Sequence, residues 1–203
     1  MSASRFTARS LAALLSLMPL ASVSQALSPQ PRPGLWMSES TTLVDGKDVA
    51  EAVMLAQVEG LQKLPPDQRA LVEQALRQRA QQKARPECLT PDEVALITRP
   101  QALLARLEES MPGCRFQPVM AGGSRLSFTG QCTNPDGFSG TLQGQWTLSG
   151  DRATHMVLRG KGRVAGAETL GLKGGAQAQH EFQTESRSTW QAADCGAVKP
   201  RTP

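Results

Sequence analysis

Four cysteines, and the segment that precedes them, restrict the fold of this 203-residue chain more than any other feature. Residues 1–26 carry Arg5 and Arg9, then an apolar stretch of about ten residues, then Ser24-Gln25-Ala26, an order typical of a secretory signal peptide. The apolar stretch is shorter than the roughly 20 residues that a transmembrane helix needs. We therefore expect cleavage after Ala26 and an exported, periplasmic protein whose cysteines form disulfides.

The glycine-containing turn Gly122-Gly123-Ser124 lies between two stretches that each contain a cysteine, and it predicts a β-hairpin. If these three residues form the loop, Ala121 faces Arg125, and counting outward places Cys114 opposite Cys132. We therefore predict a cross-strand disulfide between Cys114 and Cys132.

The other two cysteines, Cys88 and Cys195, then pair by elimination. This second disulfide closes a loop of roughly a hundred residues and contributes about 4 to 5 kcal/mol on the chain-entropy model. A zinc site would require closely spaced ligands. The cysteines are far apart, and His155 and His180 lie in separate segments, so we expect no metal and no cofactor.

Removal of the signal peptide leaves enough residues for one domain with a real core. We place this domain at 27–198, with a helical insertion at 48–110 and a disordered tail at 199–203. Two of the 22 basic residues lie in the signal peptide, which has no acidic residue, so the formal charge falls from +4 to +2. That charge is too small to indicate nucleic-acid binding.

The hydrophobic pattern changes its period twice along the domain. Residues 34–44 predict a first strand that ends at an Asp-Gly turn, and a helical pattern follows. After Gly113 the pattern becomes that of strands separated by glycine turns. These strands are predicted at 114–120, 125–132, 138–149, 152–165 and 176–190. The fold class is therefore mainly β with an α-helical insertion (α+β), as an antiparallel curved sheet or half-closed β-barrel with helices between the first and second strands.

Helix signals divide the insertion. One helix precedes Pro65-Pro66, which opens a second helix whose later half, 77–85, is too polar to be buried. Thr90-Pro91-Asp92-Glu93 is a capping box for a third helix. A similar signal at Thr98-Arg99-Pro100-Gln101 predicts the start of a fourth.

Four motifs follow one another behind the signal peptide: Gly34-Leu35-Trp36, Cys88-Leu89-Thr90-Pro91-Asp92, Cys114 with Cys132 around a glycine-containing turn, and Trp190 before Asp194-Cys195-Gly196. In this order they resemble the bacterial exported domains of domain-of-unknown-function family 3617. The chain departs from the family pattern at Gln191-Ala192-Ala193, where a Leu and a Gly are expected, and in the variable helical insertion 48–84. The resemblance implies an antiparallel β domain of unknown activity, and it supplies no catalytic residues.

No group of residues matches a catalytic motif. His155 and His180 each lie in an alternating strand, where a partly exposed structural histidine is the better interpretation than a catalytic base. Ser139 begins a strand, so it is not the nucleophile of a strand-to-helix elbow. The glycines of 171–175 lack the strand and helix that flank a phosphate-binding loop. We therefore expect no catalytic and no cofactor-binding residues.

The two ends of the sheet are expected to meet. Trp36 opens the first strand and Trp190 closes the last, which favours a common core. On one face of the last strand lie His180, Phe182, Thr184, Ser186, Ser188 and Trp190. If the sheet curls into a barrel, its interior can hold an apolar ligand.

We favour a non-enzymatic binding or interaction module of the cell envelope, whose partner is an envelope protein or an apolar small molecule. The alternatives are an apolar-ligand or lipid carrier barrel, a hydrolase with an unrecognised site, and a structural component of the envelope. The basic residues Arg77, Arg79, Lys83 and Arg85 allow a weak contact with an anionic membrane surface. A solvated helix face explains them better.

Overall fold

The computed structural model describes residues 25–81 and 84–200, so most of the predicted signal peptide lies outside the described residues. The strands are β1 (Gly34–Val44), β2 (Lys47–Asp48), β3 (Ala84–Leu89), β4 (Cys114–Gly122), β5 (Arg125–Thr133), β6 (Phe138–Leu148), β7 (Ala153–Val164) and β8 (His180–Ala192). The α-helices are α1 (Val49–Gly60), α2 (Pro66–Gln81), α3 (Pro91–Ile97) and α4 (Pro100–Ser110).

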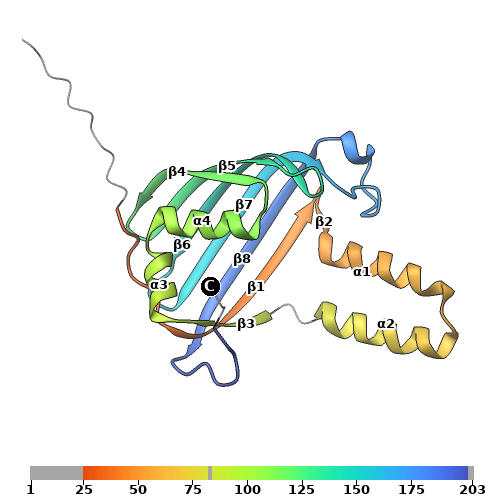
Figure 1. Cartoon of the computed structure of the whole chain (residues 1–203), viewed down its shortest axis with the longest axis horizontal. Coiled ribbons are helices and arrows are strands. Elements are labelled where there is room, and N and C mark those ends of the chain that lie inside the picture. Colours follow the sequence, from red (N-terminus) through yellow and green to blue (C-terminus); the bar gives the residue numbers. More distant parts are fainter. Residues whose placement is uncertain (1–24, 82–83, 201–203) are drawn as a thin grey trace, which may run out of the picture.

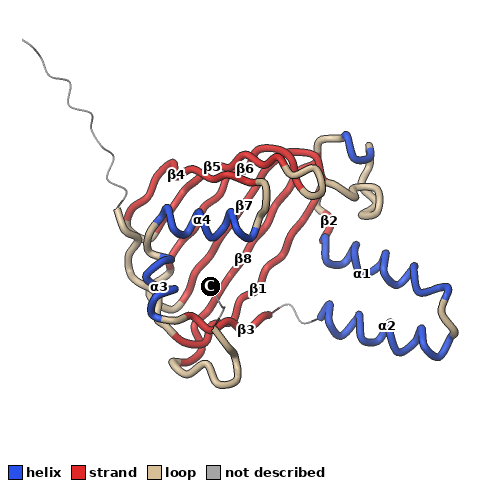
Figure 2. Tube along the Cα trace, viewed as in Figure 1, coloured by secondary structure: helices blue, strands red, loops and turns tan. Residues whose placement is uncertain are grey.

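The strands form one antiparallel sheet in the order β2-β1-β8-β7-β6-β5-β4, and β3 also pairs with β1. Figure 1 shows that the sheet is curved and that α3 and α4 lie on its inner, concave side. In Figure 2 the helices of this side stand apart from the helical hairpin α1–α2. Since β4 does not pair with β1, β2 or β3, the sheet stays open. The expected mainly β, α+β class with an unclosed curved sheet is confirmed.

The concave face of β4 to β7 carries the main core. Three leucines that are at most 1% exposed lie at its centre: Leu126, Leu142 and Leu158. Gly130 is the cross-strand partner of Phe116, and Gly144 is that of Phe128. A Cβ on these glycines would lie 2.5 Å and 2.1 Å from the phenylalanine rings. The two glycines therefore make room for rings that pack edge-to-face across the sheet.

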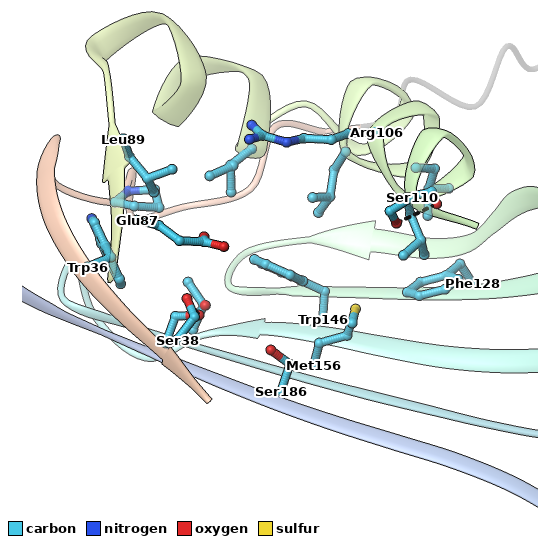
Figure 3. Close-up of a pocket in the computed structure, with 17 residues that line it drawn as sticks. Trp36, Ser38, Glu87, Leu89, Arg106, Ser110, Phe128, Trp146, Met156 and Ser186 are labelled. Atoms are coloured by element: carbon cyan, nitrogen blue, oxygen red, sulfur yellow. Dashed lines mark hydrogen bonds between the residues drawn. The ribbon is translucent and has the colours of Figure 1, made fainter. Parts of the chain in front are cut away.

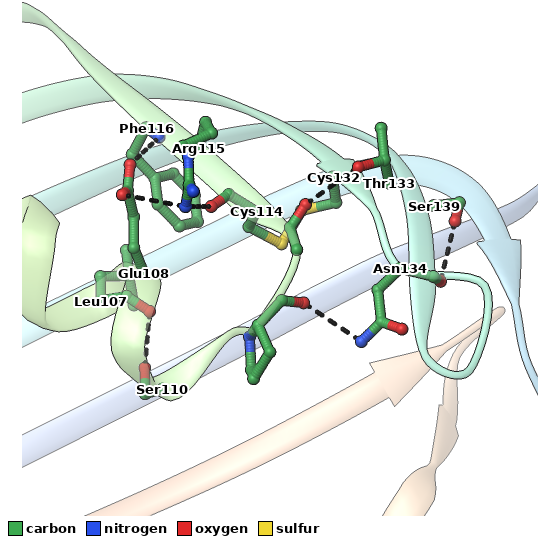
Figure 4. The surroundings of a disulfide bond; sticks show 12 residues. Leu107, Glu108, Ser110, Cys114, Arg115, Phe116, Cys132, Thr133, Asn134 and Ser139 are labelled. Carbon is green, nitrogen blue, oxygen red and sulfur yellow. Dashed lines mark hydrogen bonds and ion pairs between the residues drawn. A yellow bond between two sulfur atoms is a disulfide. The ribbon is translucent and has the colours of Figure 1, made fainter.

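Helix α4 covers this core and is held against the edge strand β4. Leu104 of α4 is 3% exposed and belongs to the core cluster. Oε1 of Glu108 accepts a hydrogen bond from the backbone N–H of Phe116 at 2.7 Å, and the Cys114–Cys132 disulfide lies beside this contact (Figure 4). The helix thus supplies the acceptor for a backbone N–H of the edge strand. This hydrogen bond holds α4 against the open edge of the sheet.

The segment after the predicted cleavage site crosses one end of the sheet. Leu27 is 3% exposed in the main core, and its backbone N–H donates to the carbonyl of Thr98 at 2.7 Å. Further along, the Arg32 guanidinium donates to the Asp151 carboxylate at 2.5 Å. This hydrogen bond holds the pKa of Asp151 below its usual value. Residues close to the expected new N-terminus are therefore part of the folded domain.

The hairpin α1–α2 projects away from the sheet (Figure 1). Asp48 caps α1 through its carboxylate, which accepts from the backbone N–H groups of Ala50 and Glu51. No residue of α1 is buried, and Leu55 and Leu71 are 56% and 70% exposed. We call residues 49–81 the helical arm.

The disulfides join Cys88 to Cys195 and Cys114 to Cys132, the pairs expected from the sequence. The expected hairpin loop was nevertheless wrong by one residue. Gly122, not Ala121, faces Arg125, and a bulge near Val119 adds one residue to β4. Because the shorter loop and the bulge compensate, the two cysteines still face each other.

Three expectations about the insertion and the tail were wrong. The 48–110 region is not helical throughout, because residues 84–89 form β3, which uses the free side of β1. Thr98 does not cap α4; its hydroxyl donates to Ala95 at the end of α3, while Arg99 precedes α4. Pro200 forms a bridge with Cys88, so the tail is not disordered from residue 199. Residues 201–203 lie outside the described part.

Candidate functional site

A cavity of about 290 Å³ lies between α4 and the concave face of the sheet (Figure 3). Its walls come from α3, α4, β3 and every strand from β5 to β8 together with β1. These segments are far apart in the sequence and meet because the sheet curves around α4. The volume is at the lower end of the range for small-molecule sites, about 300 to 1,000 Å³.

One half of the cavity is apolar. Helix α4 contributes three leucines at helical spacing, and the strands contribute one large side chain each from β5, β6 and β7. These residues are Leu103, Leu104, Leu107, Phe128, Trp146 and Met156. Successive side chains of a strand point to opposite faces, so only every second residue of the strands reaches this space.

The other half is polar and lies over β1, β3 and β8. Ser38, Ser186 and Ser188 line it together with Glu87 of β3. The hydroxyls of Ser38 and Ser188 are 2.7 Å apart and hydrogen-bonded across the two strands. Apolar and polar walls thus face the same space.

Arg106 of α4 lies at the boundary between the halves and is held by the capping box of α3. Glu93 Oε2 accepts the backbone N–H of Thr90 at 2.8 Å, and the Thr90 hydroxyl accepts that of Glu93 at 3.2 Å. The remaining Oε1 of Glu93 accepts from the Arg106 guanidinium at 3.3 Å. The predicted capping box is therefore present and also positions the cation that lines the cavity.

Two tryptophans line the cavity with different hydrogen bonding. Trp36 is 1% exposed, and its Nε1–H donates to the Arg32 carbonyl at 2.9 Å. Nε1 of Trp146 is buried and has no hydrogen-bond partner among the described residues. Figure 3 shows the Trp146 ring extending from β6 toward Glu87.

The expected meeting of Trp36 and Trp190 is partly confirmed. The two residues are register partners in the β1–β8 pair. Trp190 is not among the buried core residues, and the guanidinium carbons of Arg32 and Arg152 lie 5.6 Å and 5.2 Å from the centroid of its ring.

A second cavity, of about 430 Å³, lies against β1, β7 and β8 near the β1–β2 turn. Arg159, Lys161 and Glu181 line it with apolar and uncharged polar neighbours. No helix among the described residues contributes to its walls. Leu43 and Phe182 are its only large apolar lining residues among the described ones, so it is less apolar than the space under α4.

The two histidines have carboxylate partners but lie outside both cavities. His155 is half-exposed, as expected, and its Nε2 is 2.8 Å from Glu185 Oε1. That hydrogen bond, aided by Arg187, lowers the pKa of Glu185.

The expectation of a partly exposed His180 was wrong. His180 is 1% exposed, with Nδ1 2.7 Å from Asp45 Oδ2 and Nε2 3.4 Å from the Gly175 carbonyl. The hydrogen bond between His180 and Asp45 lowers the pKa of the Asp45 carboxyl group. The other carboxylate oxygen of Asp45 accepts the backbone N–H of Glu181 at 2.8 Å. The loop after β7 packs into a small cluster with Val44 and so covers the imidazole.

The four basic residues of the expected membrane contact do not form a described cluster. Arg77 is exposed and lies 3.9 Å from Glu73, and Arg85 is exposed on β3. Lys83 and the side chain of Arg79 lie outside the described residues.

Two absences concern the described part of the chain. Among the described residues, no group of three or more His, Cys, Asp or Glu side chains is placed so that it could hold a metal ion. None of the described helices combines the length and the apolar character that a membrane crossing requires.

Sequence reasoning missed the residues that give the cavity its chemistry. Arg106 was one polar residue in a predicted helix with several leucines, and Trp146 was one apolar residue in a predicted strand. Glu87 lies in β3, which the sequence pattern did not predict. The only usable signal was the face shared by Ser186 and Ser188 on the last strand.

The family model described as "Protein of unknown function (DUF3617)" matches residues 31–195. The match includes all four cysteines and every residue named above as lining the cavity. No curated protein and no solved structure matches the chain.

Proposed function

The chain belongs to this family of unknown function, and we propose that it is an exported, non-enzymatic binding module of the cell envelope that holds an apolar ligand between α4 and the concave face of the sheet. The observation that carries the proposal is the cavity itself. A continuous apolar core would have filled this space with side chains, because protein interiors are close-packed.

The architecture supports binding over catalysis. Both histidines have carboxylate partners, yet neither lines the cavity, so no proton-transferring pair of His and acid faces a bound molecule. The disulfides support export, because such bonds persist in oxidising compartments. N-terminal sequencing of the secreted protein, with Leu27 as the first residue, tests the predicted cleavage.

The binding test uses the protein purified from a periplasm. Native mass spectrometry asks whether a small molecule is retained, and after its extraction a small, neutral, polarity-sensitive dye, 1-aminonaphthalene, reports the free cavity. We expect saturable binding of the dye with a blue-shifted emission, and competition by the extracted material.

Matched variants on β7 locate the binding. Met156 lines the cavity, whereas the next residue, Val157, points to the other face. Met156→Trp fills the cavity and is expected to weaken dye binding at least tenfold, while Val157→Trp leaves it unchanged. Equal binding by both variants, at unchanged melting temperature, would place the ligand elsewhere and refute the proposal.

A second candidate function is contact with an anionic membrane surface through the helical arm. The observation that favours it is the exposure of Leu55, Leu71 and Arg77 on one projecting hairpin. Co-sedimentation with vesicles containing anionic lipid, lost in the double variant Leu55→Glu/Leu71→Glu and absent with zwitterionic vesicles, would support it. Equal sedimentation of wild type and variant would exclude it.

A further inference from the structure

The hydrogen bonds around the cavity indicate which ligand would fit it. The indole N–H of Trp36 is already used by the Arg32 carbonyl, but that of Trp146 is buried without a partner among the described residues. A buried donor left unpaired costs free energy. A hydrocarbon would leave this N–H unpaired. Because Nε1 itself is buried, a ligand oxygen would reach it after a small rotation of the ring and would then accept its hydrogen bond.

The polar half of the cavity also contains serines with and without a partner in the same hydrogen bond. Ser38 and Ser188 satisfy each other at 2.7 Å. Ser186 lies two residues before Ser188 on the same face of β8, and it lines the cavity without taking part in this hydrogen bond. A hydroxyl can donate or accept. A ligand that carries an oxygen would therefore find two partners, Trp146 and Ser186.

The charge at the boundary argues against an anionic ligand. Arg106 is the only basic residue among the described residues that line the cavity, and it is ion-paired with Glu93. The side chains of this pair are 29% and 14% exposed, so they are shielded from water. A carboxylate or phosphate would have to displace Glu93 from Arg106 before it could pair with the guanidinium.

We propose that the cavity binds a neutral amphiphile: an apolar body packed between α4 and β5–β7, and an uncharged hydroxyl or carbonyl oxygen at Trp146 and Ser186. This inference rests on the proposed function and names its ligand class. A volume of about 290 Å³ has room for roughly ten non-hydrogen atoms, taking about 30 Å³ for each as for a water molecule in the liquid.

The first experiment compares three ten-carbon probes, 1-decanol, decanoate and decane, by displacement of 1-aminonaphthalene at pH 7. One net hydrogen bond corresponds to about a two- to tenfold change in affinity. We expect 1-decanol to bind at least about fivefold more tightly than both other probes. Decanoate binding as tightly as 1-decanol would overturn the inference alone, and failure of all three probes would overturn the proposed function as well.

The second experiment removes the indole donor. Trp146→Phe keeps an aromatic ring and is expected to reduce the preference for 1-decanol over decane to about twofold or less. The control is Trp190→Phe, which removes an indole that donates to the Pro33 carbonyl outside the cavity. An unchanged preference in Trp146→Phe would contradict the assigned role of its N–H.

The third experiment releases the guanidinium. Glu93→Gln retains a side-chain oxygen for the capping box of α3 but loses the charge that pairs with Arg106. Decanoate affinity is expected to rise about tenfold, as for a charge-assisted hydrogen bond, while 1-decanol affinity stays the same. No gain for decanoate, in a variant whose melting temperature shows that it folds, would refute the charge argument.

Discussion

Helices α4 and α1 are of similar length and both are rich in apolar residues, yet the fold uses them in opposite ways. In α4 the leucines form one stripe, Leu104 is 3% exposed, and the helix lies on the concave face of the sheet. In α1 the apolar residues surround the helix and none is buried. The difference teaches that apolar content alone does not bury a helix: α4 lies along the sheet, whereas α1 packs near the sheet only at its first residue, Val49, and otherwise faces α2.

The largest expected effect concerns Cys88, which lies in β3, where the chain returns from the helical arm to the sheet. Cys88 and Cys195 are 107 residues apart, and the double variant Cys88→Ala/Cys195→Ala is expected to lose about 4 to 5 kcal/mol of unfolding free energy. The Cys114–Cys132 bridge spans 18 residues, so its removal is expected to cost about 3 kcal/mol. Urea unfolding measures both.

Non-reducing peptide mapping is the companion measurement. Linkage of Cys88 to any cysteine other than Cys195 would contradict the way in which β3 is attached to the end of β8.

The next largest effect is expected in α4, the helix that is buried against the sheet. Leu104→Ala leaves a cavity under α4 and is expected to lower the unfolding free energy by about 3 kcal/mol. Urea unfolding measures the loss, and 1-decanol binding should weaken in parallel because Leu104 lines the proposed site. A loss below about 1 kcal/mol would show that α4 is not packed as described.

A smaller, pH-dependent effect is expected at Asp45, where β1 ends just before the chain enters the arm. The hydrogen bond from His180 holds the pKa of Asp45 below its usual value of 3.8. A carboxyl with a lowered pKa stabilises the fold above its unfolded-state pKa and loses that contribution as the pH falls through the folded-state value. The wild type should therefore lose stability below about pH 4 more steeply than Asp45→Asn.

This difference is measured by urea unfolding at pH 7 and pH 3. Asp45→Asn should be the less stable protein at pH 7, and the gap should narrow at pH 3. A gap of equal size at both pH values would show that the carboxylate charge is not what stabilises this corner.

The smallest effect is expected in the helical arm. Leu71 is 70% exposed, so Leu71→Ala should change the unfolding free energy by no more than about 0.5 kcal/mol. Thermal and urea unfolding measure it. A loss as large as that of Leu104→Ala would abolish the contrast between the two helices and would mean that another surface covers the arm.

Much of the fold was predictable because its signals are local. The first strand, the capping box at Thr90 and the strands after Gly113 were placed from period, turn residues and proline positions, with boundaries shifted by a few residues. The Cys114–Cys132 pair was reached through an incorrect turn, since the bulge near Val119 has no clear sequence signal. Strand β3 was missed because its pairing partner, β1, lies some 50 residues earlier in the chain.

The sequence by itself determined the features that short stretches encode: the signal-peptide pattern, the alternating strands, and the cysteine spacing that favours two disulfides. Tertiary structure decided the cavity, the burial of His180 and the exposure of α1. These depend on which segments face one another when the sheet curves around α4. Trp146 has an unpaired donor, and Arg106 a paired charge, only because of neighbours that are distant in the sequence. A pattern within one segment carries no record of them.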